Sequence, residues 1–181
     1  MSRPLVVLLT WLALTACAAA QDAPGTILQA AKDGDLALVK SFLADGASVM
    51  DFDYNNSTVL HYAAWGGAEP IIDFLVANGV DLNAVNNDGF TPLHCCALSG
   101  DSAAAASLIN AGAILFTRDN NQQTPLNLCG LQNNVAVARV LIAHGADVND
   151  HNVNGWTPLR VAEYAKAADM IQLLKQSGAT E

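Results

Sequence analysis

The chain repeats itself every 33 residues, and this period constrains the fold more than any other feature of the sequence. Four kinds of position recur at this interval. They are a glycine column, a threonine column, a large aliphatic column and a small-residue column: Gly46, Gly79, Gly112, Gly145, Gly178; Thr58, Thr91, Thr124, Thr157; Ile27, Leu60, Leu93, Leu126, Leu159; Ala30, Ala63, Cys96, Cys129, Ala162. Such columns predict five similar units stacked in one domain over residues 23–181.

Each unit is predicted to hold two helices. Thr91-Pro92 is typical of a helix start, because threonine caps the first backbone N–H groups and proline lacks the N–H that would go unsatisfied there. The second helix is predicted by apolar residues at helical spacing, such as Ile71, Ile72, Phe74, Leu75 and Val76, and it ends where the glycine column supplies a left-handed residue. Polar segments such as 83–89 and 149–155 predict β-turn or hairpin loops between units.

Two segments resemble the ankyrin repeat nearly letter for letter: Gly89-Phe-Thr-Pro-Leu-His94 and His144-Gly-Ala-Asp-Val-Asn149. The resemblance implies an all-α ankyrin-repeat α-solenoid of about five helix-turn-helix units, with loops projecting on one edge. Some positions depart from the pattern and predict that repeats four and five are less regular: Gln122 for the loop glycine, Asn127 and Arg160 for the motif histidine, and Asn133 for the glycine between helices. Polar residues in the first and last repeats predict caps that stop further stacking.

Residues 1–20 have the layout of a secretory signal peptide, with Arg3, a short apolar run over 5–14 and small residues after it. Two cleavage sites compete. Leu14-Thr15-Ala16-Cys17 resembles a bacterial lipobox, in which Cys17 would become the lipidated first residue, and Ala18-Ala19-Ala20 fits a cut before Gln21. We favour the lipobox because its residue types fall in order. Either site predicts a periplasmic protein, or an outer-membrane lipoprotein facing the periplasm.

The charge of the chain excludes some partners. The formal net charge is −9, and no basic patch is visible in the sequence. Such a chain repels phosphate backbones and anionic headgroups, so we expect no nucleic-acid binding and no membrane contact beyond a lipid anchor. We expect a monomer.

The four histidines and four cysteines do not form a recognisable site. His61 and His94 occupy the motif position that orders the start of a helix, and no second ligand pair has zinc spacing. No nucleophile elbow or phosphate loop is present, so we expect neither a cofactor nor catalysis. Neighbouring packed helices lie about 8–10 Å apart, beyond the roughly 7 Å limit for a disulfide between Cys96 and Cys129. We therefore predict three free, mostly buried thiols in the domain after the signal segment.

The 33-residue period also places the candidate partner-binding residues. In folds like the ankyrin repeat, recognition uses the loop tips and the exposed side of each first helix. The helix column is largely apolar, and the loop tips add aromatic and polar residues: Lys32, Trp65, Leu98, Leu131, Tyr164; Tyr54, Phe90, Trp156, Asp88, Arg118, Asn120. Exposed aromatics with polar surroundings are typical of interface anchors. The alternative is that Trp65 and Leu98 pack on a neighbouring loop.

These observations predict a non-catalytic adaptor or scaffold that binds another exported protein. An alternative is a periplasmic inhibitor or immunity protein that neutralises a secreted toxin, since an acidic chain would be steered toward a basic enzyme. A third hypothesis, an enzyme that uses His94 and the cysteines, has no supporting motif.

Overall fold

The computed structural model describes residues 26–180. The predicted signal segment 1–20 and its Cys17 lie outside the described residues. Within them the chain forms ten helices and no strand, apart from one isolated antiparallel bridge between Phe52 and Thr58. This arrangement confirms the predicted all-α solenoid of five helix pairs.

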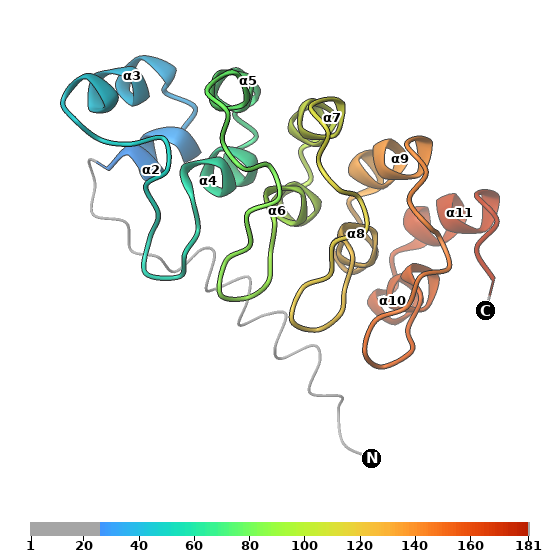
Figure 1. The fold of residues 1–181 in the computed structure, drawn as a ribbon. Helices are drawn as coiled ribbons and strands as arrows, with labels where there is room; N and C mark the ends of the chain where they lie inside the picture. Colours follow the sequence, from blue (N-terminus) through green and yellow to red (C-terminus); the bar gives the residue numbers. More distant parts are fainter. Residues whose placement is uncertain (1–25, 181) are drawn as a thin grey trace.

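The helices form two layers, and hairpin loops project from the edge of one of them (Figure 1). The first helices of the repeats make the inner layer: α2 (Ile27–Lys32), α4 (Val59–Gly66), α6 (Pro92–Ser99), α8 (Pro125–Gln132) and α10 (Pro158–Ala165). The second helices make the outer layer: α3 (Leu36–Ala44), α5 (Glu69–Ala77), α7 (Ser102–Asn110), α9 (Val135–Ala143) and α11 (Ala168–Gln176). Each inner helix contacts the inner helix of the next repeat, so the pairs stack in sequence order.

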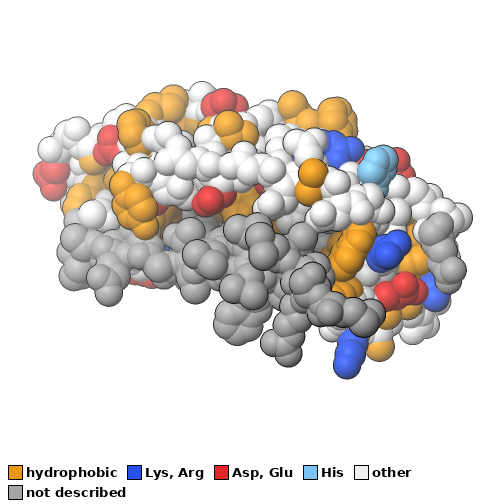
Figure 2. Space-filling model, turned by 90° about the horizontal axis from the view of Figure 1, so that it is seen from below, with side chains coloured by type: hydrophobic (Ala, Val, Ile, Leu, Met, Phe, Trp, Pro, Cys, Tyr) orange, Lys and Arg blue, Asp and Glu red, His pale blue; other side chains and the backbone are white. Residues whose placement is uncertain are grey.

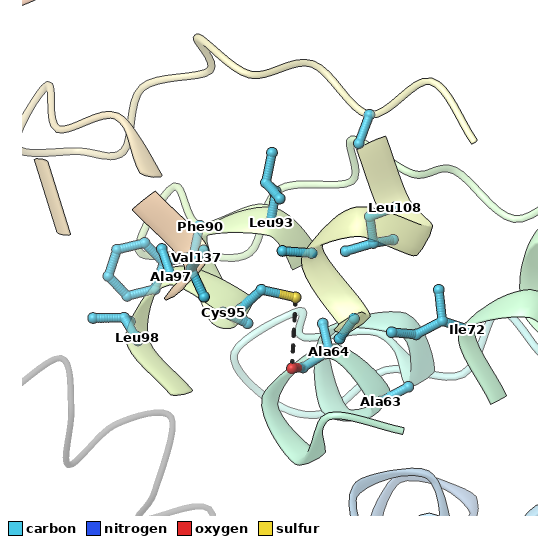
Figure 3. Packing of buried hydrophobic residues seen from close by; sticks show 14 of the residues in the cluster. Ala63, Ala64, Ile72, Phe90, Leu93, Cys95, Ala97, Leu98, Leu108 and Val137 are labelled. Carbon is cyan, nitrogen blue, oxygen red and sulfur yellow. Dashed lines mark hydrogen bonds between the residues drawn. The ribbon is translucent and has the colours of Figure 1, made fainter. Parts of the chain in front are cut away.

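The core lies between the two layers and runs the length of the stack. Large aliphatic residues such as Leu60, Ile72 and Leu93 are fully buried. The small-residue column is buried at every position, which lets the helices approach closely. Figure 3 shows this packing where α4 meets α6. A weak hydrogen bond, 3.7 Å long, joins Cys96 Sγ to the carbonyl oxygen of Ala64. Because this core is continuous, each repeat is stabilised chiefly by its neighbours.

Repeats four and five are as regular as the others, and the expectation of local irregularity is wrong. Asn133 takes the left-handed conformation at the end of α8, with φ 58°, where the first three repeats have glycine and the fifth has Lys166, also at φ 58°. Gln122 also has φ 58° in the third hairpin. The backbone bond from Asp119 N to Gln123 O is 3.0 Å long, as is the equivalent bond from Asn86 N to Phe90 O. Asparagine enters this conformation at small cost, and the surrounding hydrogen bonds hold the less suited glutamine in it.

Both ends of the stack carry the predicted polar residues. Asp33, Asp35 and Lys40 are exposed in the first repeat, and Lys166 and Lys175 are exposed in the last. Such ends resist the addition of another repeat.

Across the part of the chain that the structure describes, no helix combines the length and apolar character that crossing a bilayer requires.

Candidate functional site

The loops between repeats are hairpins of one common design. In each, the residue that opens the turn places its side-chain oxygen under the turn and accepts two backbone N–H groups. Asn86 Oδ1 accepts from Asp88 at 3.0 Å and from Phe90 at 2.9 Å. Asp119 Oδ1 accepts from Asn121 at 2.8 Å and from Gln123 at 2.7 Å. These bonds hold each loop in a defined shape without a sheet.

The hairpin tips are also joined to one another. The backbone N–H of Asn87 donates to the carbonyl of Asn55 at 2.9 Å, and that of Asn120 donates to Asp88 at 3.1 Å. Side chains add to this ladder, since Asn120 Nδ2 donates to the carbonyl of Asn87 at 2.8 Å. A fourth hairpin continues it through the bond from Val153 N to Asn121 O at 3.2 Å. The loop edge is therefore a connected platform, already ordered before any partner arrives.

Histidines join the inner helices to these hairpins. His61 Nε2 lies 2.9 Å from the carbonyl oxygen of Phe90, and His94 Nε2 lies 3.1 Å from that of Gln123. Asn127 performs the same task in the fourth repeat, where its Nδ2 lies 3.5 Å from the carbonyl oxygen of Trp156. Burial lowers the pKa of His61, and it lowers the pKa of His94 to about 4, so both rings are neutral near pH 7. They are structural groups, as the sequence motif indicated.

The cysteines offer no reactive site. Cys95, Cys96 and Cys129 are buried and none of them forms a disulfide, which confirms the prediction of three thiols outside any disulfide at these positions. Burial raises the pKa of the Cys96 and Cys129 thiols far above its ordinary range, so neither forms the thiolate that metal binding and nucleophilic attack require. Among the described residues, no group of His, Cys, Asp and Glu side chains is placed to hold a metal ion.

Two of the predicted partner-binding residues are buried, and their predicted exposure is wrong. Phe90 is 3% exposed because its ring lies in the repeat junction, stacked on His94 at a centroid distance of 5.8 Å. Leu98 is 7% exposed because it belongs to the hydrophobic cluster of α6 and its neighbours. Because Leu98 is buried in this cluster, the helix column is not a continuous exposed stripe.

The other predicted residues keep some access to solvent. Tyr54 and Tyr164 are exposed, whereas Trp65, Leu131 and Trp156 are half-buried. Trp156 and Tyr164 contact each other with ring centroids 5.3 Å apart, and Arg160 lies over the Trp156 ring at 5.5 Å. The structure thus brings these last two aromatics together at the C-terminal end, far along the stack from Tyr54.

A more extensive apolar surface lies on the hairpin arms that leave the outer helices, and the sequence interpretation missed most of it. Its residues point to solvent and alternate along the first arm, as in an extended chain. The next two hairpins have apolar residues at equivalent positions of the repeat. Val85 lies one 33-residue period after Phe52, and Phe116 lies two periods after Met50. We call these residues the hairpin face: Met50 (52% exposed), Phe52 (63%), Tyr54 (76%), Val85 (56%) and Phe116 (74%). Two sequence signals could have found these residues: the alternation of apolar and polar residues along the first arm, and apolar residues at the equivalent positions of the later repeats.

Figure 2 shows the side of the molecule from which the hairpins project, with hydrophobic side chains spread over its uncovered part. The side chains of the hairpin face are exposed to solvent. Soluble proteins rarely leave several large apolar side chains exposed in this way without a binding role. Arg118 borders the hairpin face, but its guanidinium is engaged with Asp150 and with the carbonyls of Gln122 and His151.

Comparison with known families agrees with this geometry. A family model described as ankyrin repeats (3 copies) matches residues 27–119 and again residues 107–180. Proteins with ankyrin repeats typically bind other proteins and are generally non-enzymatic. No curated protein matches the chain with significant sequence similarity.

Proposed function

Because the chain belongs to the ankyrin-repeat family, we propose that it is a non-catalytic adaptor or scaffold whose protein partner docks on the hairpin face. The observation that carries this proposal is a group of large, exposed apolar side chains on loops that are tied together before binding. Rigid aromatic anchors contribute most of the affinity in protein interfaces, and a preordered platform lowers the entropy cost of docking.

The test compares two variants in partner capture by crosslinking. Phe52→Ala with Phe116→Ala removes two anchors that are mostly in solvent, so folding is little affected. Leu38→Ala removes a large apolar side chain of 41% exposure from outer helix α3 and serves as the matched control. We expect the double variant to lose most of the crosslinked product and the control to retain it. Equal yields from both variants, with unchanged circular dichroism, would reject the hairpin face as the docking surface.

We further propose that the protein acts in the periplasm or at the outer membrane. The signal-like layout of residues 1–20 supports this location, and Cys17 in its lipobox-like context supports a lipid anchor. Growth with labelled palmitate tests the anchor directly. Label on the wild type and none on Cys17→Ala supports lipidation, whereas an unlabelled product beginning at Gln21 supports cleavage after Ala20.

A second candidate function is inhibition of a basic secreted enzyme, such as a toxin. The acidic character of the chain favours it, because opposite charge raises the rate of encounter. A tight complex of one inhibitor with one basic enzyme, together with loss of that enzyme's activity, distinguishes it from a scaffold that holds a resident protein weakly. We propose a monomeric protein in either role.

A further inference from the structure

The hairpin face lies in a part of the chain that has no basic residue. Between Lys40 and Arg118 there is no lysine or arginine. The same stretch contains eight carboxylates: Asp45, Asp51, Asp53, Glu69, Asp73, Asp81, Asp88 and Asp101. Its two histidines, His61 and His94, are buried with lowered pKa values and stay neutral near pH 7. All five residues of the hairpin face therefore lie in a stretch of the chain whose charged side chains are all negative near pH 7, with Phe116 close to its end.

The other end of the stack is electrically balanced. Residues 118–180 contain five Lys or Arg and five Asp or Glu. Both salt bridges recorded among the described residues are here, Arg118 with Asp150 and Lys175 with Glu163. In Figure 2 acidic side chains are spread from left to right, while the large Lys and Arg side chains gather toward the right. The negative field is thus concentrated on the first three repeats.

Carboxylates are the immediate chain neighbours of the apolar residues in the first hairpin, and their side chains leave the chain on its other side. Asp51 and Asp53 alternate with Met50, Phe52 and Tyr54 along one arm. Their hydrogen bonds are with neutral groups, since Asp51 accepts from Ser48 N at 3.0 Å and Asp53 accepts from Tyr62 Oη at 2.9 Å.

In the next hairpin a carboxylate, Asp88, lies three residues after Val85. Asp88 Oδ2 accepts from Asn55 Nδ2 at 2.9 Å. Among residues 26–180, none of Asp51, Asp53 and Asp88 forms an ion pair. Covering the apolar residues would desolvate these charges, and that cost is offset only if the partner supplies cations.

We propose that the hairpin face docks a protein segment that combines apolar side chains with lysine or arginine. This inference rests on the proposed binding function and specifies the chemistry of the partner. Apolar side chains of the segment cover Phe52, Tyr54 and Val85, and its cations lie near Asp51 and Asp88. An acidic segment is repelled by the same field, and an uncharged apolar one leaves the carboxylates desolvated without a counter-charge.

The experiment uses the full chain and three labelled synthetic peptides of equal length. They alternate leucine with lysine, leucine with glutamate, and serine with lysine. Fluorescence anisotropy titrations measure their affinities at low and at physiological ionic strength. We expect the leucine–lysine peptide to bind at least about tenfold more tightly than either of the others, with weaker binding at higher salt.

Charge-neutralising variants locate the contact. Asp51→Asn with Asp88→Asn keeps the side-chain shape and hydrogen-bond acceptors, and should weaken the leucine–lysine peptide by about tenfold. Asp147→Asn with Asp169→Asn makes the same change of charge at exposed positions in the balanced part of the chain, and should have little effect. Phe52→Ala with Phe116→Ala should weaken binding to a similar degree as the first pair.

Several outcomes would overturn the proposal. They are equal binding of the lysine and glutamate peptides, equal binding of the leucine–lysine and serine–lysine peptides, equal effects of the two pairs of Asp→Asn changes, and no binding of any peptide. Crosslinking to the partner shows whether such an outcome rejects only the basic character of the docked segment or also the proposed binding function. If crosslinking still depends on Phe52 and Phe116 while the peptides fail, the chain remains a protein-binding module and only the basic character of its partner is wrong.

Discussion

His94 Nε2 lies 3.1 Å from the carbonyl oxygen of Gln123, a residue of the next hairpin. On its other side, His94 Nδ1 accepts from the backbone N–H of Thr91 at 3.1 Å. Because a carbonyl oxygen only accepts, Nε2 carries the proton and Nδ1 is the acceptor. One neutral ring therefore caps the start of α6 and holds the following repeat in place.

Removal of the His94 ring should destabilise the protein. His94→Ala leaves the N–H of Thr91 and the carbonyl of Gln123 without this partner, and we expect a loss of about 2–4 kcal/mol in the free energy of unfolding. His94→Asn should cost less, because Asn127 makes the equivalent pair of bonds in the fourth repeat. Urea unfolding measures both. His144→Ala, at an exposed position, is the control, and a similar loss there would remove the special role of His94.

The pH dependence of stability should show the titration of His94. Its pKa is about 4 in the folded chain, lowered chiefly by burial, against 6.5 ordinarily. The unfolded chain binds the proton first, so the free energy of unfolding should fall as pH drops from 6.5 toward 4, by roughly 3 kcal/mol from this group. The loss should be smaller in His94→Asn. Identical acid profiles for the wild type and this variant would contradict the assignment.

Asp119 should have the opposite effect. Burial raises its pKa to about 6 from 3.8, and Oδ2 has no hydrogen-bond partner among the described residues. The folded chain holds this proton more tightly, so its stabilising contribution is present below pH 3.8 and is lost as pH rises through 6. Asp119→Asn removes the buried charge and keeps the Oδ1 acceptor. We expect a gain of about 2 kcal/mol at pH 8 and none at pH 3 in urea unfolding.

Asp53 supplies the matched control for this experiment. It occupies the same position of the first hairpin, but its Oδ2 accepts from Tyr62 Oη at 2.9 Å. Asp53→Asn should therefore bring no gain at pH 8, and an equal gain from both substitutions would point to a general charge effect instead.

Gln122 holds a backbone conformation that favours glycine. Its φ is 58°, and Gly89 and Gly155 occupy the same hairpin position at φ 81° and 71°. Gln122→Gly should raise the free energy of unfolding by about 1 kcal/mol, because a side chain is strained in this region. The reverse change, Gly89→Ala, should destabilise the protein, since an added Cβ would lie 2.7 Å from Asn120 N. Thermal unfolding should show a higher melting temperature than the wild type for Gln122→Gly and a lower one for Gly89→Ala.

The three thiols of the repeat domain should be unreactive until the chain unfolds. Cys95, Cys96 and Cys129 are fully buried, and a buried thiol cannot reach an alkylating reagent. Intact mass after alkylation without reductant should show no addition at these residues in the folded protein and three additions in denaturant. Fewer than three on the unfolded chain would indicate a disulfide.

The repeating architecture could be predicted from the sequence because its signals are local. Thr91 and Pro92 begin a helix whose first bonds lie within four residues, and Gly112 ends one with φ 103° in the same short range. Such signals depend only on residues close in the sequence and not on contacts with the next repeat, and each of them recurs every 33 residues. The structural role of His61 and His94 followed from the same motif positions.

Only the tertiary structure decided which loop aromatics reach solvent. Phe52 and Phe90 both follow polar turn residues, yet one is 63% exposed and the other 3% exposed. The difference arises because Phe90 stacks on His94 where one repeat meets the next, whereas Phe52 has no such ring contact within residues 26–180. Exposure in this fold depends on contacts between residues about one repeat apart, such as that of Asn87 with Asn55. Those contacts exist only once the helix pairs have stacked, because a single repeat cannot bury its own faces.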